Sequence, residues 1–329
     1  MVNISGENVV LVGALLLFVA VMAGKVAYRF GAPALLLFLG VGMLFGLDFI
    51  SYRSVDMTQF VGMIALCIIL FTGGMDTSFQ EIKPIIGPGV VLATVGVVMT
   101  AMVLAGFVWL IAPWIGLQIS FPLALLLAST MSSTDSASVF SILRSKKQGL
   151  KQHLRPLLEL ESGSNDPMAY MLTILLIGVV TNSSGDVSMG MSIVYFVIQM
   201  IVGALSGYLI GRLAVWTINK INLANHSLYS VLLLAFIFFA FAFTDLVKGN
   251  GYLAVYLAGL VVGNHKLTQK RSLTVFFDGF TWLMQIVMFL TLGLFVNSME
   301  LFRPEVLILG CAVGAFMILV ARPVTVFAC

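Results

Sequence analysis

Long apolar runs, separated by short polar or charged segments, make up most of the chain. Breaking the sequence at glycine, proline and charge clusters gives candidate spans at residues 8–27, 33–47, 59–75, 88–112, 121–143, 156–181, 189–218, 227–246, 251–264, 273–295 and 306–327. An apolar run of about 17 to 25 residues can cross a hydrocarbon layer about 30 Å thick. The pattern therefore predicts an all-α, polytopic membrane protein with about eleven transmembrane helices.

Composition supports the same class of protein. Apolar residues make up 60% of the chain and charged residues only 9%, whereas soluble domains carry about 25% charged residues. The first apolar run begins near Val9 without a preceding basic residue or a following small-residue cleavage site, so we expect a mature span rather than a signal peptide. The three cysteines show no metal-ligand or disulfide spacing.

Lysine and arginine are distributed unevenly between the two sides that eleven spans define. Fourteen of the seventeen fall on one side: Lys25, Arg29, Lys83, Arg144, Lys146, Lys147, Lys151, Arg155, Arg212, Lys220, Lys266, Lys270, Arg271 and Arg322. The other side carries Arg53, Lys248 and Arg303. Because cytoplasmic loops are enriched in basic residues, the N-terminus is expected outside. Topology thus explains the positive charge, and no nucleic-acid partner is expected.

The fifth span contains an unusual run of hydroxyl side chains. Ser129, Thr130 and most residues from 132 to 138 are polar, and Asp135 lies among them. Serine and threonine hydroxyls can bond to nearby backbone groups, so the helix is expected to unwind near Thr134 and Asp135 and to offer carbonyl oxygens to an ion. The alternative is a polar seam packed inside the helix bundle.

The sixth span carries the densest polar cluster of the chain, which runs from Glu159 to Asp166 and ends at Pro167. Glu161 and Asp166 are five positions apart, about 140° around a helix, which predicts separate roles. Ser162 and Asp166 are four positions apart and share a face, which suits joint coordination of a cation.

These residue types favour a hard cation. Carboxylate, hydroxyl and backbone oxygens are suitable ligands for such an ion, and the absence of nearby histidine and cysteine argues against zinc, copper or iron. A carboxylate that has lost contact with water takes up a proton more readily. One carboxylate can therefore carry either species, which is the minimum that cation/proton exchange requires.

The segments SSTDSASVF at 132–140 and ESGSNDP at 161–167 resemble the cation:proton antiporter-1 family, in particular its bacterial potassium/proton branch of cell-volume regulation. FTGGMD at 71–76 and ARP at 321–323 support the resemblance. It implies an antiporter fold of thirteen spans with inverted repeats and broken crossing helices. It also implies a homodimer in the bacterial inner membrane that exchanges K⁺, in preference to Na⁺, for H⁺.

The resemblance assigns roles to matching positions. Asp166 would be the essential carrier of cation and proton, and the monovalent cation would bind at Asp166, Asp135 and Ser162 with backbone oxygen from Thr134. Asn165 stands where electrogenic relatives have a second aspartate, which implies electroneutral exchange. Glu161 would pair with Arg322, because a charge buried alone is far less stable than a pair.

The resemblance also implies how the single transmembrane domain at 1–329 is organised. Core-domain helices would lie at about 88–181 and 306–329, and dimerisation-domain helices at about 8–75 and 189–295. Thr72 stands where some members have a glutamate. Family members continue past ARP into a broken helix and a further span, and some have a cytoplasmic regulatory domain, for which residues 1–329 contain no sequence.

A cation channel and an intramembrane enzyme are the two alternative functions. A cation channel would need a repeated selectivity filter or a pore ring, and the sequence shows neither. An intramembrane enzyme would need a glycine-rich setting around Asp135 and Asp166 or a nucleophile elbow, which Gly163–Ser164 does not form. Neither an enzyme nor a cofactor is therefore expected.

A small-residue stripe marks the seventh span. Gly203, Gly207 and Gly211 recur every four residues, which lets another helix approach closely. Whether that neighbour belongs to the same chain or to a second protomer is left open by the sequence.

Overall fold

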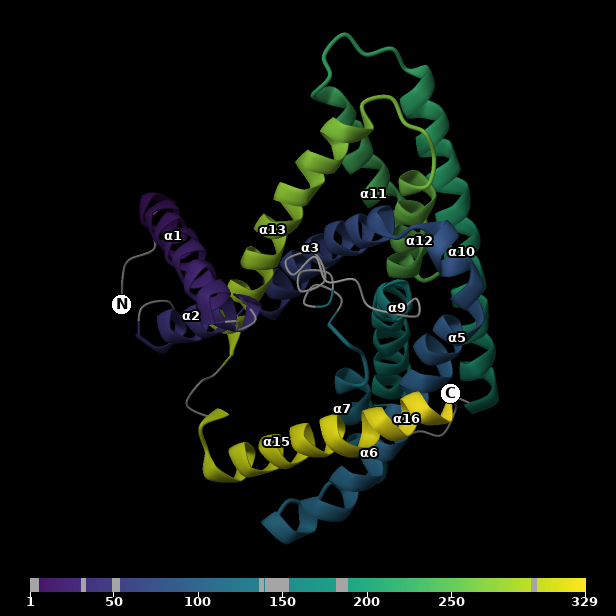
Figure 1. The fold of residues 1–329 in the computed structure, drawn as a ribbon. Coiled ribbons are helices and arrows are strands. Elements are labelled where there is room, and N and C mark those ends of the chain that lie inside the picture. The colour runs from purple at the N-terminus through teal and green to yellow at the C-terminus, as the bar shows by residue number, and fades with distance from the viewer. Residues whose placement is uncertain are drawn as a thin grey trace. The chain divides into compact units, whose positions relative to one another are not determined.

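The computed structural model describes residues 6–30, 34–48, 54–135, 139, 154–181, 189–296 and 301–329, and all regular secondary structure in these ranges is helical (Figure 1). The helices are α1 (Gly6–Phe30), α2 (Ala34–Asp48), α3 (Val55–Asp76), α4 (Phe79–Ile82), α5 (Ile86–Val91), α6 (Val97–Ile111), α7 (Phe121–Met131), α9 (Leu154–Thr181), α10 (Met189–Lys220), α11 (Leu228–Leu246), α12 (Gly251–Gly263), α13 (Lys270–Phe295), α15 (Pro304–Phe316) and α16 (Arg322–Ala328). Short 3-10 turns occur at Lys83–Ile85 and Ala112–Ile115, and π turns at Leu92–Gly96 and Met317–Ala321.

Eleven apolar helical segments in the described residues match the eleven predicted spans. Seven are long and apolar enough to cross a membrane: Val55–Asp76, Phe79–Ile115, Leu154–Thr181, Val194–Lys220, Leu228–Leu246, Lys270–Phe295 and Pro304–Ala328. Four shorter ones are Val10–Lys25, Ala34–Gly46, Phe121–Met131 and Gly251–Gly263. The predicted all-α, polytopic class is confirmed.

Two predicted boundaries differ from the structure by more than five residues. The fourth apolar segment begins at Phe79 instead of residue 88, because Pro84 occupies the start of a 3-10 turn, where no backbone donor is needed. The fifth was predicted to run from 121 to 143, but α7 ends at Met131. Residues 136–138 and 140–143 lie outside the described residues.

The chain divides into two compact units, and each is described by itself. The first contains Met1–Ile69 and Thr274–Leu307. In it, α2 approaches α13 closely: a Cβ added at Gly42 would lie 2.4 Å from the carbonyl oxygen of Leu290. Only a glycine allows this approach. The units do not follow the expected border between core and dimerisation helices, and that functional division stays a prediction.

The second unit contains Leu70–Leu273 and Ile308–Cys329, and α12 lies at its centre. Eleven of the thirteen residues of α12 are buried. The glycine stripe of α10 packs against it, since a Cβ added at Gly207 would lie 2.4 Å from the carbonyl oxygen of Ala254. The neighbour of the stripe is therefore a helix of the same chain.

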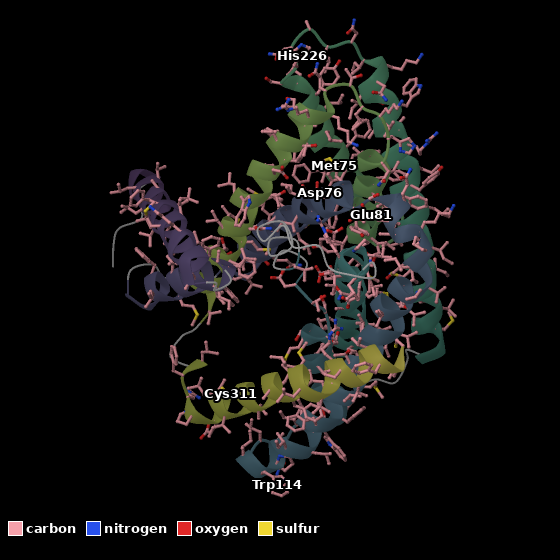
Figure 2. All side chains as sticks on the ribbon, viewed as in Figure 1. Met75, Asp76, Glu81, Trp114, His226 and Cys311 are labelled. Carbon is pink, nitrogen blue, oxygen red and sulfur yellow. The ribbon has the colours of Figure 1, made fainter. Side chains whose placement is uncertain are left out.

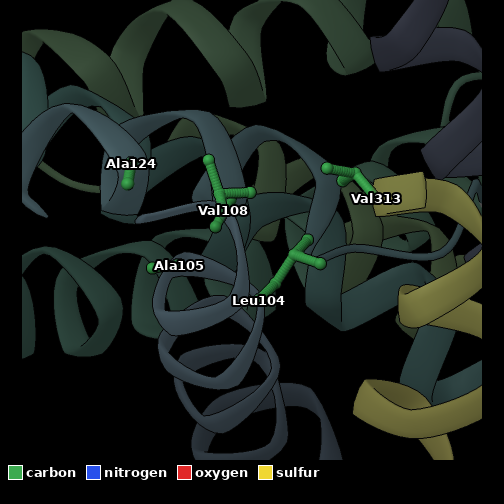
Figure 3. Close-up of a cluster of buried hydrophobic side chains, with 6 residues drawn as sticks. Leu104, Ala105, Val108, Ala124 and Val313 are labelled. Atoms are coloured by element: carbon green, nitrogen blue, oxygen red, sulfur yellow. The ribbon is translucent and has the colours of Figure 1, made fainter. Parts of the chain in front are cut away.

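An apolar cluster within the second unit fixes α7 against two other helices. Figure 3 shows this cluster, which consists of Leu104, Ala105, Val108, Ala124, Ala128 and Val313, all buried. Next to it, the rings of Phe107 and Phe316 stack with centroids 3.9 Å apart. The first part of α7 is thus held by side chains of α6 and of residues 308–316.

Candidate functional site

The helix of the fifth span ends before Thr134 and Asp135, as the run of hydroxyls predicts. The hydroxyls of Ser129, Thr130 and Ser132 each donate, at 2.7 Å, to a carbonyl three residues earlier. Such bonds compete with the regular helical ladder. The helix ends at Met131, and Thr134–Asp135 lies in non-helical backbone. The Thr134 carbonyl accepts from the hydroxyls of Ser133 at 3.2 Å and Ser162 at 3.4 Å, whereas the Asp135 carbonyl accepts from the N–H of Val139 at 3.0 Å.

The sixth span, α9, remains one helix although Pro167 lies inside it. Proline has no backbone N–H and removes one helical bond. The Asn250 side chain binds the helix at this point: its Nδ2 donates to the Pro167 carbonyl at 3.1 Å, and its Oδ1 accepts from the N–H of Leu253 at 3.0 Å. Asn250 thus caps α12 and ties it to α9.

Asp166 faces the interruption of the fifth span. The hydroxyl of Ser133 donates to Oδ1 of Asp166 and lies 3.4 Å from Oδ1 of Asn165. Asp166 is partly buried, at the middle of α9. Asp135 follows Thr134 in the same non-helical backbone, and its side chain is exposed. The interrupted segment therefore brings a hydroxyl to the carboxylate of Asp166.

A second set of contacts joins the same segment to the buried face of α9. Oγ1 of Thr134 donates to Oγ of Ser162 at 3.2 Å and accepts from Nδ2 of Asn165 at 2.7 Å. Ser162 and Asn165 are fully buried. Ser162 and Asp166 both contact residues 133–134, which confirms that they share a face. Thr134, Ser162, Asn165 and Asp166 are thus brought together.

Glu161 and Arg322 form the expected ion pair. Nη2 of Arg322 donates to Oε1 of Glu161 at 2.9 Å, and the same oxygen accepts from Nδ2 of Asn165 at 2.9 Å. Arg322 begins α16 directly after the π turn at Met317–Ala321. The extra residue in such a turn re-aims the side chains that follow it. Glu161 therefore connects α16, through Asn165, to Thr134.

Two residues of this site were not singled out from the sequence. Ser133 is one of several hydroxyl residues in the run, and nothing in the sequence distinguishes it from the other serines. Asn250 directly precedes α12, and an Asn at this position is a known capping signal that could have identified it. Neither long-range contact could be read from sequence spacing, because the partners are more than thirty positions apart.

A multi-spanning helical protein in which the helix of one span ends opposite a partly buried carboxylate of the next span has the architecture of a secondary transporter. Residues 14–329 match the sequence model of the family described as "Sodium/hydrogen exchanger, transmembrane". The chain belongs to this family. It is accordingly a multi-pass membrane protein of a transporter family and not an enzyme.

Among its relatives, the chain is 40% identical over 321 residues to the K(+)/H(+) antiporter NhaP of Alkalimonas amylolytica, which covers 96% of this chain and 54% of the relative. It is 36% identical over 320 residues to the K(+)/H(+) antiporter NhaP2 of Shewanella sp. strain ANA-3, with the same shares covered. The chain thus spans about half the length of these curated relatives.

A solved structure confirms the fold. The sodium proton antiporter MjNhaP1 from Methanocaldococcus jannaschii, determined at pH 8, matches with a TM-score of 0.79 at 22% sequence identity. The match covers 96% of this chain and 76% of that one.

Proposed function

We propose that the protein exchanges a monovalent cation for protons across the membrane, K⁺ in preference to Na⁺. The observation that carries the proposal is the contact of Asp166 with the interrupted segment after α7. The two relatives named as K(+)/H(+) antiporters favour potassium.

Asp166 is the group that carries either ion. When its carboxylate is ionised, it binds the cation together with the hydroxyl of Ser162, backbone oxygen from Thr134 and a ligand from Asp135. When Asp166 is protonated, the negative charge that attracts the cation is lost. The cation and the proton therefore occupy the site alternately.

The residues around Asp166 determine how much net charge one exchange cycle moves. Asn165 contributes no charge, and its amide donates to Thr134 and Glu161 instead. Arg322 neutralises Glu161 through their ion pair. Asp166 is the one carboxylate that alternates between cation and proton, so one cation is exchanged for one proton and no net charge moves.

The cellular setting follows from the sequence and the relatives. The fourteen basic residues on one side favour an outside N-terminus in the bacterial inner membrane. In this setting a homodimer would contribute to cation, pH and volume homeostasis.

Competition between cation and proton tests the proposal. Inverted vesicles are given a pH gradient, and initial rates of its dissipation are measured over a K⁺ series, and separately over a Na⁺ series, at several pH values. We expect the half-saturating K⁺ concentration to rise as pH falls, while high K⁺ restores the rate without a current. A half-saturating concentration that does not change with pH contradicts a shared site.

A further inference from the structure

One face of α9 is polar well beyond the site around Asp166. Arg155, Glu159, Ser162 and Asp166 follow one another at spacings of four, three and four residues. At 100° per residue, these positions fall within about 60° around the helix. The polar face therefore runs from the first turn of α9 to the site around Asp166. Glu159 lies seven residues, or about 10 Å, before Asp166 along the helix axis.

Glu159 is a buried carboxylate in this polar face. Its residue is only 7% exposed, and its Oε1 accepts from Nε of Arg155 at 2.9 Å. The side chain of Arg155 is 43% exposed. An ordinary ion pair between positions i and i+4 leaves both charges in water. Here the acid is enclosed and only the base reaches the surface, so a helix-surface ion pair does not explain the position of Glu159.

Tyr256 of α12 supplies a second polar group at the same place. Its ring covers Gly163, one turn after Glu159, since a Cβ there would lie 2.4 Å from Cε2 of Tyr256. The phenol interacts electrostatically with Glu159 and lies within reach of Thr77. The hydroxyl of Thr77 donates to the Gly73 carbonyl at 2.8 Å, and its oxygen could still accept, but the phenol does not reach hydrogen-bond geometry with it.

The hydroxyl of Tyr256 is fully buried and has no hydrogen-bond partner among the residues that the structure describes. A buried polar group without a partner is unfavourable, and a bound water or ion can supply the missing partner. Phenol and carboxylate oxygens are both ligands for a hard cation. A cation with its remaining water would satisfy the hydroxyl of Tyr256 and neutralise Glu159 together.

Two further acids lie near the start of this polar face. Figure 2 labels Asp76, at the end of α3, and Glu81, in α4. Both interact electrostatically with Arg155. Both side chains are exposed. Acidic groups at an opening raise the local concentration of cations. Their charges attract the guanidinium of Arg155 as well.

We infer that Glu159 and Tyr256 form a second, staging site for the transported monovalent cation on the membrane side where α9 begins. Arg155 pairs with the Glu159 carboxylate when the site is empty, and this ion pair breaks when a cation binds. The inference rests on the proposed exchange at Asp166 and adds an ordered step to it: the cation binds first at Glu159 and then moves about 10 Å along α9 to Asp166.

Two single variants with opposite expected effects test the staging site. The protein is reconstituted in vesicles, and half-saturating K⁺ concentrations are measured separately with K⁺ on each side. Glu159→Gln should raise the value about tenfold, but only on the side where α9 begins. Arg155→Gln should lower it on that side, because the cation no longer competes with the guanidinium. If Arg155 and Glu159 formed only a structural ion pair, the two variants would change the value in the same direction.

Two conservative variants keep the test independent of folding. Glu159→Asp retains the charge and should restore most of the affinity. Tyr256→Phe retains the ring over Gly163 and removes only the hydroxyl, so it should raise the half-saturating concentration about threefold on the same side. Melting temperatures of all variants are measured in parallel.

The outcomes separate this inference from the proposed function. Equal effects of Glu159→Gln on both sides, or no effect on either, overturn the staging site while K⁺/H⁺ exchange by the unsubstituted protein still supports Asp166. Absence of any cation-dependent proton movement in the unsubstituted protein overturns the proposed function itself.

Discussion

The first part of α7 and the segment that follows it differ sharply in what surrounds them. Ala124 and Ala128 pack into an apolar cluster with α6 and residues 308–316, and they make no polar contact there. Ser133 and Thr134, a few positions later, bond to side chains of α9. Dispersion contacts fix α7 in place, so the segment after it can hold its polar groups in position. Substitutions in the two regions should therefore affect different measurements.

The largest expected effect is on transport, in the polar region. Asp166→Asn should reduce cation-dependent proton movement to background, because an amide keeps the shape of the side chain but can neither ionise nor carry a proton. Membrane abundance and melting temperature should stay close to those of the unsubstituted protein. Asp56→Asn, at an exposed position in the first turn of α3, removes the same charge elsewhere and serves as the control. Wild-type transport by Asp166→Asn contradicts the assignment.

The next effect is on stability, at the edge of the polar region. Glu161→Gln leaves Arg322 unpaired, and breaking a buried pair costs about 3 to 5 kcal/mol. The lower end is expected, because the Arg322 side chain is 19% exposed. Combining it with Arg322→Gln should cost less than the sum of the two single losses. Strictly additive melting temperatures would show that the pair is not coupled.

In the apolar region, Leu104→Ala should lower the free energy of unfolding by about 2 kcal/mol. This is the low end for a buried leucine, because lipid tails surround the unfolded helices in place of water. The half-saturating K⁺ concentration should not change. Leu110→Ala, on the same helix but 64% exposed, provides the control. A changed cation affinity in Leu104→Ala would mean that the apolar cluster does more than hold α7.

The smallest effect is expected at the exposed edge of the site. Asp135→Asn should raise the half-saturating K⁺ concentration about threefold, if its carboxylate contributes to cation binding. A lower maximal rate with an unchanged half-saturating concentration would instead assign Asp135 to the organisation of the helix interruption. Rate measurements over a K⁺ series distinguish the two results.

Sequence patterns predicted the spans well, because a bilayer admits only segments that satisfy their own backbone groups. The interruption near Thr134 was also predictable, since its cause is local: hydroxyls that bond to the backbone three residues away. The contact of Ser133 with Asp166 was not, and neither was the bond of Asn250 to Pro167. Such contacts depend on how separate helices pack, which no local pattern records.

The glycines show the same limit to what a local sequence pattern can predict. The stripe at Gly203, Gly207 and Gly211 predicted close packing but not the partner, which the structure identifies as α12. Gly163 lies in no such stripe, and its contact with Tyr256 had no signal in the sequence. Family resemblance supplied the pairing of Glu161 with Arg322, which local spacing could not have provided.

The π turn at Met317–Ala321 sets the rotational phase of everything that follows it. Deleting one residue there would turn α16 by about 100°, so Arg322 would point away from Glu161. A one-residue insertion would have the same consequence in the opposite sense. In an alignment of relatives, a gap within these five positions should therefore coincide with a displaced arginine. A relative with such a gap and an arginine at the same position would need another irregular turn nearby to restore the rotational phase.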